Sequence, residues 1–328
     1  MQKNPYYHGP KSDHFDGLRF HGPGIRRDKT FRDVARMLLR SVPKRMPWPR
    51  SAPIVENPPP PARVQGSTIR LTFIGHSSFL LQTEGVNLLL DPVWSQRAGP
   101  AGIGPRRVTA PGLAIGDLPT IDAVLLSHNH YDHMDVATLA RLARKRPAPV
   151  LTPLGNDTIL HRGNRGIEAQ AFDWGQSVKV GALTIHFVPA LHWSARRRND
   201  RRMALWASFV IEGPRHNIYF AGDTSFGDGK LFDAIGAKYG PFRLAILPIG
   251  AYAPRGFMKD QHCDPDEAVS MFQRLGAEFA FACHWGTFRL TQEPYDEPIA
   301  RLEAALAKAG IDPARFRSGP PGTAIEWR

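Results

Sequence analysis

The sequence predicts an α/β fold in which two β-sheets pack face to face between two layers of helices, an αββα sandwich. After residue 66 short apolar segments come first, and strand and helix patterns alternate later in the chain. Runs of strands followed by strand–helix alternation fit two sheets with helices on their outer faces better than one doubly wound sheet. The 328 residues, 42% of them hydrophobic, are enough to bury such a core without disulfide staples.

The expected strands are short apolar segments bounded by turn residues. Residues 67–94 are typical of successive strands with a turn at Glu84-Gly85, and the apolar run 123–127 is typical of a buried strand. Further strands are expected at 148–153, 179–190, 205–213, 217–224, 243–250, 279–285 and 323–328.

Helical patterns are expected at 136–146, 229–240, 264–276 and 298–310. The third has the clearest start signal. Asp264 stands at the N-cap, Pro265 at the first helical position and Glu267 at the third, which is a capping-box arrangement. This helix is therefore expected to begin directly after Asp264.

The N-terminal part of the chain differs in composition from the rest. Residues 1–50 hold 12 Lys/Arg and 4 Asp, so they contribute +8 to a net charge of +12. Residues 28–42 fit an amphipathic helix with a basic face, which either packs on the main domain or lies on an anionic membrane. The proline run at 56–63 is typical of a stiff linker. We therefore divide the chain into a basic extension with its linker, residues 1–63, and a main domain, residues 64–328.

Composition also bears on the compartment. The two cysteines, Cys263 and Cys283, exclude a disulfide framework and suit a reducing environment. The first residues lack the apolar core of a signal peptide, and no window approaches the roughly 18 apolar residues that span a bilayer. We expect a cytoplasmic protein, with peripheral contact to the inner face of a membrane as an additional hypothesis.

The strongest chemical signal is SHNHYDHMD, residues 127–135, at the end of the expected strand 123–127. Alternate side chains of an extended stretch share a face, so His128 and His130 can point to one place. Asp132 and His133 begin the next turn and can reach a neighbouring place. Imidazole nitrogens and carboxylates are ligands of zinc-like metals. Three histidines and an aspartate within six residues therefore predict a metal site.

Three later strands also end in a residue that can bind a metal. His192, Asp223 and His284 each follow an apolar run. Any one of them alone would be weak evidence, because a lone histidine is more often a core or surface residue. The three share one position relative to their strands, and they would supply the ligands that a second metal needs.

This pattern resembles the metallo-β-lactamase superfamily, in which H-x-H-x-D-H is followed by single His, Asp and His ligands. The segments PALHW, FAGDT, GPFRLAILPIGAYAPRGFMKDQHCDPDEA and HWGTFRLTQEP are similar to one branch of it. That branch contains the N-acyl-phosphatidylethanolamine-hydrolysing phospholipase D and its bacterial relatives. The resemblance covers residues 66–328 and implies the metallo-β-lactamase fold.

The resemblance implies two metal ions, with Zn²⁺ expected and iron or manganese as alternatives. One ion would be held by His128, His130 and His192. The other would be held by Asp132, His133 and His284. Asp223 would bridge the two ions, and Asp91 would hydrogen-bond the ligand loop. Catalytic roles follow for Asp223 and for Asp132, which could also steer the attacking water.

Residues around this cluster are candidates for supporting the ligands or contacting the substrate. His76 follows a strand, His262 precedes a helix, and Tyr252 lies in a loop after a strand. Local capping is the alternative for His262. The arginines that follow His192 suit phosphate, with a solvated loop as the alternative; they are Arg196, Arg197, Arg198, Arg201 and Arg202.

The expected function is that of a zinc-dependent hydrolase, a phosphodiesterase of the phospholipase D type acting on N-acyl-phosphatidylethanolamine-like phospholipids. A hydrolase of a small soluble ester or lactone is the first alternative. A nuclease is less favoured, because positive charge is present without a nucleic-acid-binding module. The expected partners are a phospholipid or other anionic substrate and, as a peripheral contact, an anionic membrane. No nucleic-acid partner is expected. The sequence does not decide between a monomer and a homodimer.

Overall fold

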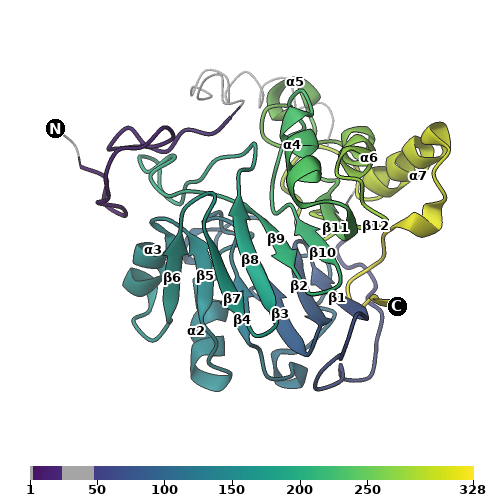
Figure 1. The fold of residues 1–328 in the computed structure, drawn as a ribbon, viewed down its shortest axis with the longest axis horizontal. Helices are drawn as coiled ribbons and strands as arrows, with labels where there is room; N and C mark the ends of the chain where they lie inside the picture. The colour runs from purple at the N-terminus through teal and green to yellow at the C-terminus, as the bar shows by residue number, and fades with distance from the viewer. Residues whose placement is uncertain (1–2, 24–47) are drawn as a thin grey trace.

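The structure, a computed structural model, describes residues 3–23 and 48–328. The expected helix at 28–42 lies outside the described residues. The described chain forms two seven-stranded sheets. Helices α2 and α3 lie with the first sheet, and α4, α6 and α7 lie with the second (Figure 1). The predicted αββα sandwich is therefore confirmed.

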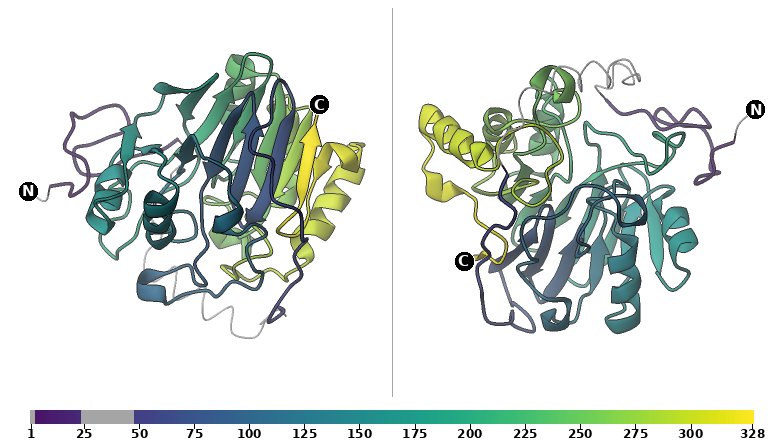
Figure 2. Two further views of the ribbon diagram at one scale, coloured as in Figure 1. Left: turned by 90° about the horizontal axis from the view of Figure 1, so that it is seen from below. Right: turned by 180° about the vertical axis from the view of Figure 1, so that it is seen from behind.

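The first sheet has the strand order β14-β1-β2-β3-β4-β5-β6. Its strands are β1 (Ile69–Gly75), β2 (Ser78–Thr83), β3 (Val86–Leu90), β4 (Ala123–Leu125), β5 (Val150–Pro153), β6 (Ala169–Phe172) and β14 (Ala324–Trp327). The C-terminal strand β14 runs antiparallel beside β1, as yellow beside blue in Figure 2. Strands β3 to β6 are parallel, so their carboxyl ends lie at one edge of the sheet.

The second sheet has the order β13-β12-β11-β10-β9-β8-β7. Its strands are β7 (Ser177–Val180), β8 (Leu183–Val188), β9 (Ser208–Glu212), β10 (Asn217–Phe220), β11 (Phe242–Pro248), β12 (Phe279–Cys283) and β13 (Phe316–Arg317). Strands β10 to β13 are parallel. The single strand expected at 179–190 is a hairpin, because Gly181 adopts a left-handed conformation, φ 58°, and turns the chain between β7 and β8.

The four predicted helices are present. The helices are α2 (Val136–Lys145), α3 (Asn156–Gly163), α4 (Lys230–Tyr239), α5 (Arg255–Met258), α6 (Pro265–Arg274) and α7 (Glu297–Ala309), with 3₁₀ turns at Pro100–Gly102, Ile115–Asp117 and Pro313–Arg315. The predicted capping box of α6 is confirmed, because Asp264 accepts from the Glu267 N–H and the Glu267 side chain accepts from the Asp264 N–H.

Burial explains why the strands read as continuous apolar runs. In β1, Phe73 lies in the core between the sheets, whereas its neighbour Ile74 packs on the outer face. In β3, Leu90 likewise lies in the core between the sheets, and Leu89 packs on the outer face. Side chains of α2 and α3 cover that outer face, and side chains of α4, α6 and α7 cover the other sheet. A strand buried on both faces needs apolar residues at every position.

Residues 3–23, which we call the N-terminal segment, form neither a helix nor a regular strand. Phe15 and Phe20 are buried against Leu205 and Trp206 of the main domain. The division of the chain at residue 63 stays a prediction. In residues 3–23 and 48–328, no helix has both the length and the apolarity needed to cross a membrane.

Candidate metal centre

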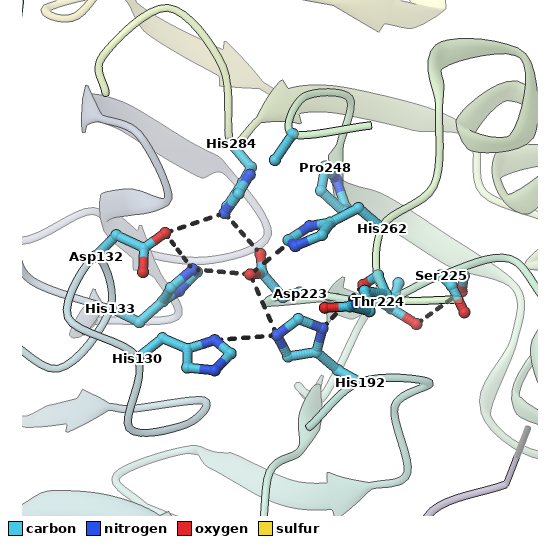
Figure 3. A network of polar contacts seen from close by, with 12 residues as sticks. His130, Asp132, His133, His192, Asp223, Thr224, Ser225, Pro248, His262 and His284 are labelled. Carbon is cyan, nitrogen blue, oxygen red and sulfur yellow. Dashed lines mark hydrogen bonds and ion pairs between the residues drawn. The ribbon is translucent and has the colours of Figure 1, made fainter. Parts of the chain in front are cut away.

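The predicted ligands follow strands whose carboxyl ends meet at one edge of the sandwich. The first four lie in the loop between β4 and α2, which we call the ligand loop, residues 126–135. His192 follows β8, Asp223 follows β10 and His284 follows β12. Because β10 and β12 run parallel to the strand between them, Asp223 and His284 leave the second sheet at the same edge. Figure 3 shows the histidine side chains converging on Asp223.

Asp223 occupies the middle of the cluster and is 3% exposed. Its Oδ2 lies 3.2 Å from His133 Nε2, 3.6 Å from His192 Nε2 and 3.8 Å from His128 Nε2. Its Oδ1 lies 3.1 Å from His284 Nε2. One carboxylate therefore faces histidines of both predicted ligand sets, which is the arrangement that a bridging ligand requires.

The ligand atoms fall into two groups, within each of which all atoms lie within 4.8 Å of one another. The first group is His128, His130, His192 and Asp223. The second is His76, Asp132, His133 and His284. The structure therefore brings all seven predicted ligands together. His76 joins them because its Nε2 lies 3.0 Å from Asp132 Oδ2.

The chemistry of these groups fits a divalent metal. Buried polar atoms that lack a well-aligned hydrogen bond within the described part of the chain include His130 Nε2, His133 Nε2, His284 Nε2 and Asp223 Oδ1. Buried polar atoms in proteins are nearly always paired, so unpaired ones need an explanation. Imidazole nitrogens and carboxylate oxygens are the donors that zinc and related ions take. A bound metal would engage these atoms.

The electrostatics of the cluster point the same way. Burial lowers the pKa of His130 to about 3 and that of His192 to about 4, so both rings are neutral at pH 7 and keep a free lone pair. Burial also acts to lower the pKa of His284, but Asp223 and Asp132 outweigh it and raise that pKa to about 9. The buried carboxylates thus favour a positive charge beside them, which a metal ion would supply in place of the proton.

Asp91 supports the ligand loop, where the resemblance placed it. It follows β3 and is fully buried. Its Oδ1 accepts from the Ser127 N–H at 2.7 Å, and its Oδ2 accepts from the Ser127 hydroxyl at 2.6 Å. The same Oδ2 lies 2.7 Å from His133 Nδ1. A histidine that donates from Nδ1 to a carboxylate presents a more basic Nε2 to a metal.

Gln261 is a supporting residue that sequence reasoning missed. Its backbone oxygen lies 2.9 Å from His192 Nδ1, which leaves Nε2 of that ring facing the cluster. Its side-chain oxygen accepts from Trp193 Nε1 at 2.8 Å. A contact made by a backbone carbonyl leaves no signature in the sequence. The only signal in this segment was the neighbouring candidate His262.

The two remaining candidates have different surroundings. His262 lies at the cluster, with Nδ1 3.9 Å from Asp223 Oδ2, and it shares a potential metal group with Asp223 and His284. Tyr252 is not brought to the cluster. It is 2% exposed, and its hydroxyl donates to Glu297 at 2.7 Å, so its side chain is committed to the start of α7. Contact of Tyr252 with a substrate stays a prediction.

The fold and the His/Asp cluster are those of a metal-dependent hydrolase. The chain belongs to the beta-lactamase superfamily, whose model, described as "Beta-lactamase superfamily domain", matches residues 86–285. An uncharacterised protein of Mycobacterium tuberculosis is 41% identical, over 78% of this chain and 68% of that protein.

"N-acyl-phosphatidylethanolamine-hydrolyzing phospholipase D 1" of Caenorhabditis elegans is 39% identical, over 72% of this chain and 69% of that protein. The solved structure of Igni18, a metallo hydrolase from Ignicoccus hospitalis, shares the fold with a TM-score of 0.59 and 23% identity, over 80% of this chain and 99% of that one. The family resemblance predicted from the sequence is confirmed.

Chelation is expected to lower the midpoint of thermal unfolding, because a metal would bind the folded cluster and not the same residues dispersed in the unfolded chain. At a free metal concentration of about 100 times Kd, binding adds about 2.7 kcal/mol to the free energy of unfolding. Differential scanning calorimetry with zinc, with chelator, and with zinc restored after chelation measures the shift. Equal midpoints in all three would contradict a metal centre.

Proposed function

We propose that this chain is a binuclear zinc-dependent phosphodiesterase of the phospholipase D type, acting on N-acyl-phosphatidylethanolamine-like phospholipids. The observation that carries the proposal is the pair of His/Asp groups that meet at the buried Asp223. Similarity to the Caenorhabditis elegans protein, whose name states this substrate, supports the substrate class. Peripheral contact with an anionic membrane, also proposed, would bring the chain to such a substrate.

The proposed division of labour follows the two groups. His128, His130 and His192 would hold one ion, Asp132, His133 and His284 the other, and Asp223 would lie between the ions. Bound divalent ions would lower the pKa of water and stabilise charge that develops on phosphoryl oxygens. Asp132 contacts His76 and His284 through Oδ2, at 3.0 and 3.4 Å. Within residues 3–23 and 48–328 its Oδ1 makes no such contact, so this oxygen would be the one to orient the attacking water.

An arginine-rich loop beside the cluster supports an anionic substrate. The Arg201 guanidinium lies 3.7 Å from the centre of the Trp193 ring, and Trp193 packs edge-on against His130 with ring centres 4.5 Å apart. Arg197 and Arg198 of the same loop are exposed. Positive charge next to a site raises the local concentration of anions such as phosphodiesters.

A hollow of about 620 Å³ offers room for part of a substrate. Its lining includes Leu191 and Ser225, which stand one and two residues from the ligands His192 and Asp223, and also Lys259. Ligand pockets typically measure about 300–1,000 Å³. The lining also holds a second lysine, Lys230, and two aspartates, Asp228 and Asp260, so it is apolar in part and carries charges of both signs. The apolar part suits the acyl chain of an amphiphilic substrate.

A mass-spectrometric screen of zinc-loaded protein tests the proposal. The panel holds N-acylated and ordinary phospholipids in vesicles, soluble lactones and short RNA. We expect N-acyl-phosphatidylethanolamine to yield phosphatidic acid and an N-acylethanolamine. His284→Ala should abolish this turnover, whereas His186→Ala, which removes an imidazole paired with Glu212 away from the cluster, should retain it.

The other outcomes of the screen overturn the proposed substrate. Turnover of lactones alone would establish the soluble-ester alternative, and cleavage of RNA alone would establish a nuclease. No turnover of any lipid by a protein that holds its full complement of zinc would leave a metal hydrolase with a different substrate class.

A further inference from the structure

The ligand loop has little regular structure of its own. It leaves β4 and reaches α2 through a turn in which the N–H groups of His133 and Met134 both donate to the His130 carbonyl, at 3.1 and 2.8 Å. This turn carries His130, Asp132 and His133, three of the proposed ligands. Because so few backbone bonds lie within the turn, its shape depends on contacts from elsewhere in the chain.

Arg196 supplies several of those contacts, in addition to those from Asp91 and His76. Its Nη1 donates to the carbonyl of Asn129 at 2.9 Å and to the carbonyl of Met134 at 2.8 Å. Asn129 stands just before the turn, and Met134 is its last residue. Its guanidinium stacks 3.9 Å from the centre of the Tyr131 ring, and the Tyr131 hydroxyl donates to the Arg196 carbonyl at 3.0 Å. Hydrogen bonds from a charged donor are about twice as strong as neutral ones. A single side chain thus ties both ends and the middle of the turn.

Asp200 in turn fixes the backbone of Arg196. Its Oδ1 accepts from the N–H groups of Arg196 and Arg197, at 3.0 and 2.8 Å. Its Oδ2 accepts from the hydroxyl of Tyr6 at 2.8 Å, across a separation of 194 residues. Asp200 and Tyr6 are 2% and 7% exposed, so water competes little for these bonds.

The N-terminal segment holds the same loop at two further points. Asn4 Nδ2 donates to the Met203 carbonyl at 2.9 Å, and the Phe20 N–H donates to the Arg202 carbonyl at 2.7 Å. A continuous series of hydrogen bonds therefore runs from Tyr6 through Asp200 and Arg196 to the turn that carries the proposed ligands.

We propose that Arg196 is a positioning residue of the metal centre, and that the N-terminal segment keeps Arg196 in place through Tyr6 and Asp200. The inference rests on the metal centre of the proposed function and is independent of the substrate. The N-terminal segment would then help to keep the proposed ligands in position, although none of its own residues is a proposed ligand.

Titration of the metal-free protein with Co²⁺ and Zn²⁺ tests the role of Arg196 without any substrate. Outer partners of ligands typically contribute 10- to 100-fold to metal affinity. We expect Arg196→Ala to lose about that much affinity and to change the visible absorption spectrum of bound Co²⁺. Arg196→Lys should recover the affinity only in part, because an ammonium group cannot stack on Tyr131 as a planar guanidinium does. Arg165→Ala, which removes an exposed arginine outside this loop, should leave affinity and spectrum unchanged.

Tyr6→Phe tests the N-terminal segment, because it deletes only the hydroxyl that Asp200 accepts. It should lower Co²⁺ affinity several-fold in the wild-type background and have no effect in the Arg196→Ala background, because the two residues act in series. The matched control is Tyr7→Phe, because within residues 3–23 and 48–328 Tyr7 is hydrogen-bonded through its backbone N–H, at 3.0 Å from Asn4 Oδ1, and not through its hydroxyl. Circular dichroism checks that each variant is folded.

Wild-type affinity and spectrum in Arg196→Ala would overturn the role of Arg196. Equal losses from Tyr6→Phe in both backgrounds would overturn the connection to the N-terminal segment. Failure of the wild-type protein to bind either metal would instead overturn the metal centre, so the two failures are distinguishable.

Discussion

Replacing Asp223 by asparagine is expected to lower turnover about a thousandfold and to reduce the metal content of the purified protein. Asp223 faces His133, His192 and His284 at 3.1–3.6 Å, so both proposed ions depend on it. Metal ions contribute several kcal/mol to stabilising the transition state, and about 1.4 kcal/mol corresponds to a tenfold change in rate. An amide keeps the shape of the side chain but loses the negative charge that would balance the two proposed ions.

Metal content by inductively coupled plasma mass spectrometry, measured together with turnover, separates this effect from misfolding. Asp233→Asn is the matched control, because Asp233 is half exposed and pairs with Arg274 on the surface. Surface ion pairs contribute about 0–1 kcal/mol, so this variant should keep both metal and turnover. Full metal content with wild-type turnover in Asp223→Asn would rule out Asp223 as the shared ligand.

The clustering of the proposed ligands could be predicted, because the signal is local. Each of His192, Asp223 and His284 stands just after an apolar strand, and parallel strands bring their carboxyl ends to one edge. The residues that support the proposed ligands could not be predicted in this way. Gln261 acts through a backbone oxygen, and Tyr6 reaches Asp200 across 194 residues, so neither contact leaves a pattern in the sequence.

The same contrast applies to the fold. Strands buried on both faces were predicted, because continuous apolar runs mark them. Strand β6 was missed, because none of its four residues is fully buried and its sequence, AQAF, has no strong pattern. Helix α3 was missed because it begins after Gly155, which provides no side-chain cap, so the usual start signal is absent. The split of 179–190 into a hairpin depended on Gly181, whose backbone conformation is not specified by its identity alone.

Replacing Asp91 by alanine is expected to have the largest effect on stability, a loss of about 3–5 kcal/mol, which is typical when one partner of a buried charged network is removed. The truncation leaves the Ser127 N–H, the Ser127 hydroxyl and His133 Nδ1 without their acceptor, in a place with no access to water. The effect should be present in metal-free protein, because these bonds do not involve a metal. Urea unfolding of the metal-free variants measures it.

Two further variants show whether the loss comes from the acceptor itself. Asp91→Asn keeps one oxygen for the Ser127 N–H and tolerates the positive φ of 36° at this position, so it should lose clearly less stability than alanine. Asp117→Ala removes an exposed aspartate from a 3₁₀ turn and should change stability by less than about 0.5 kcal/mol. If Asp91→Ala unfolds at the same urea concentration as Asp117→Ala, then Asp91 does not support the ligand loop. If it unfolds earlier and also binds zinc 10- to 100-fold more weakly, one buried carboxylate contributes both to the stability of the fold and to the position of His133, as expected for a partner that orients a ligand.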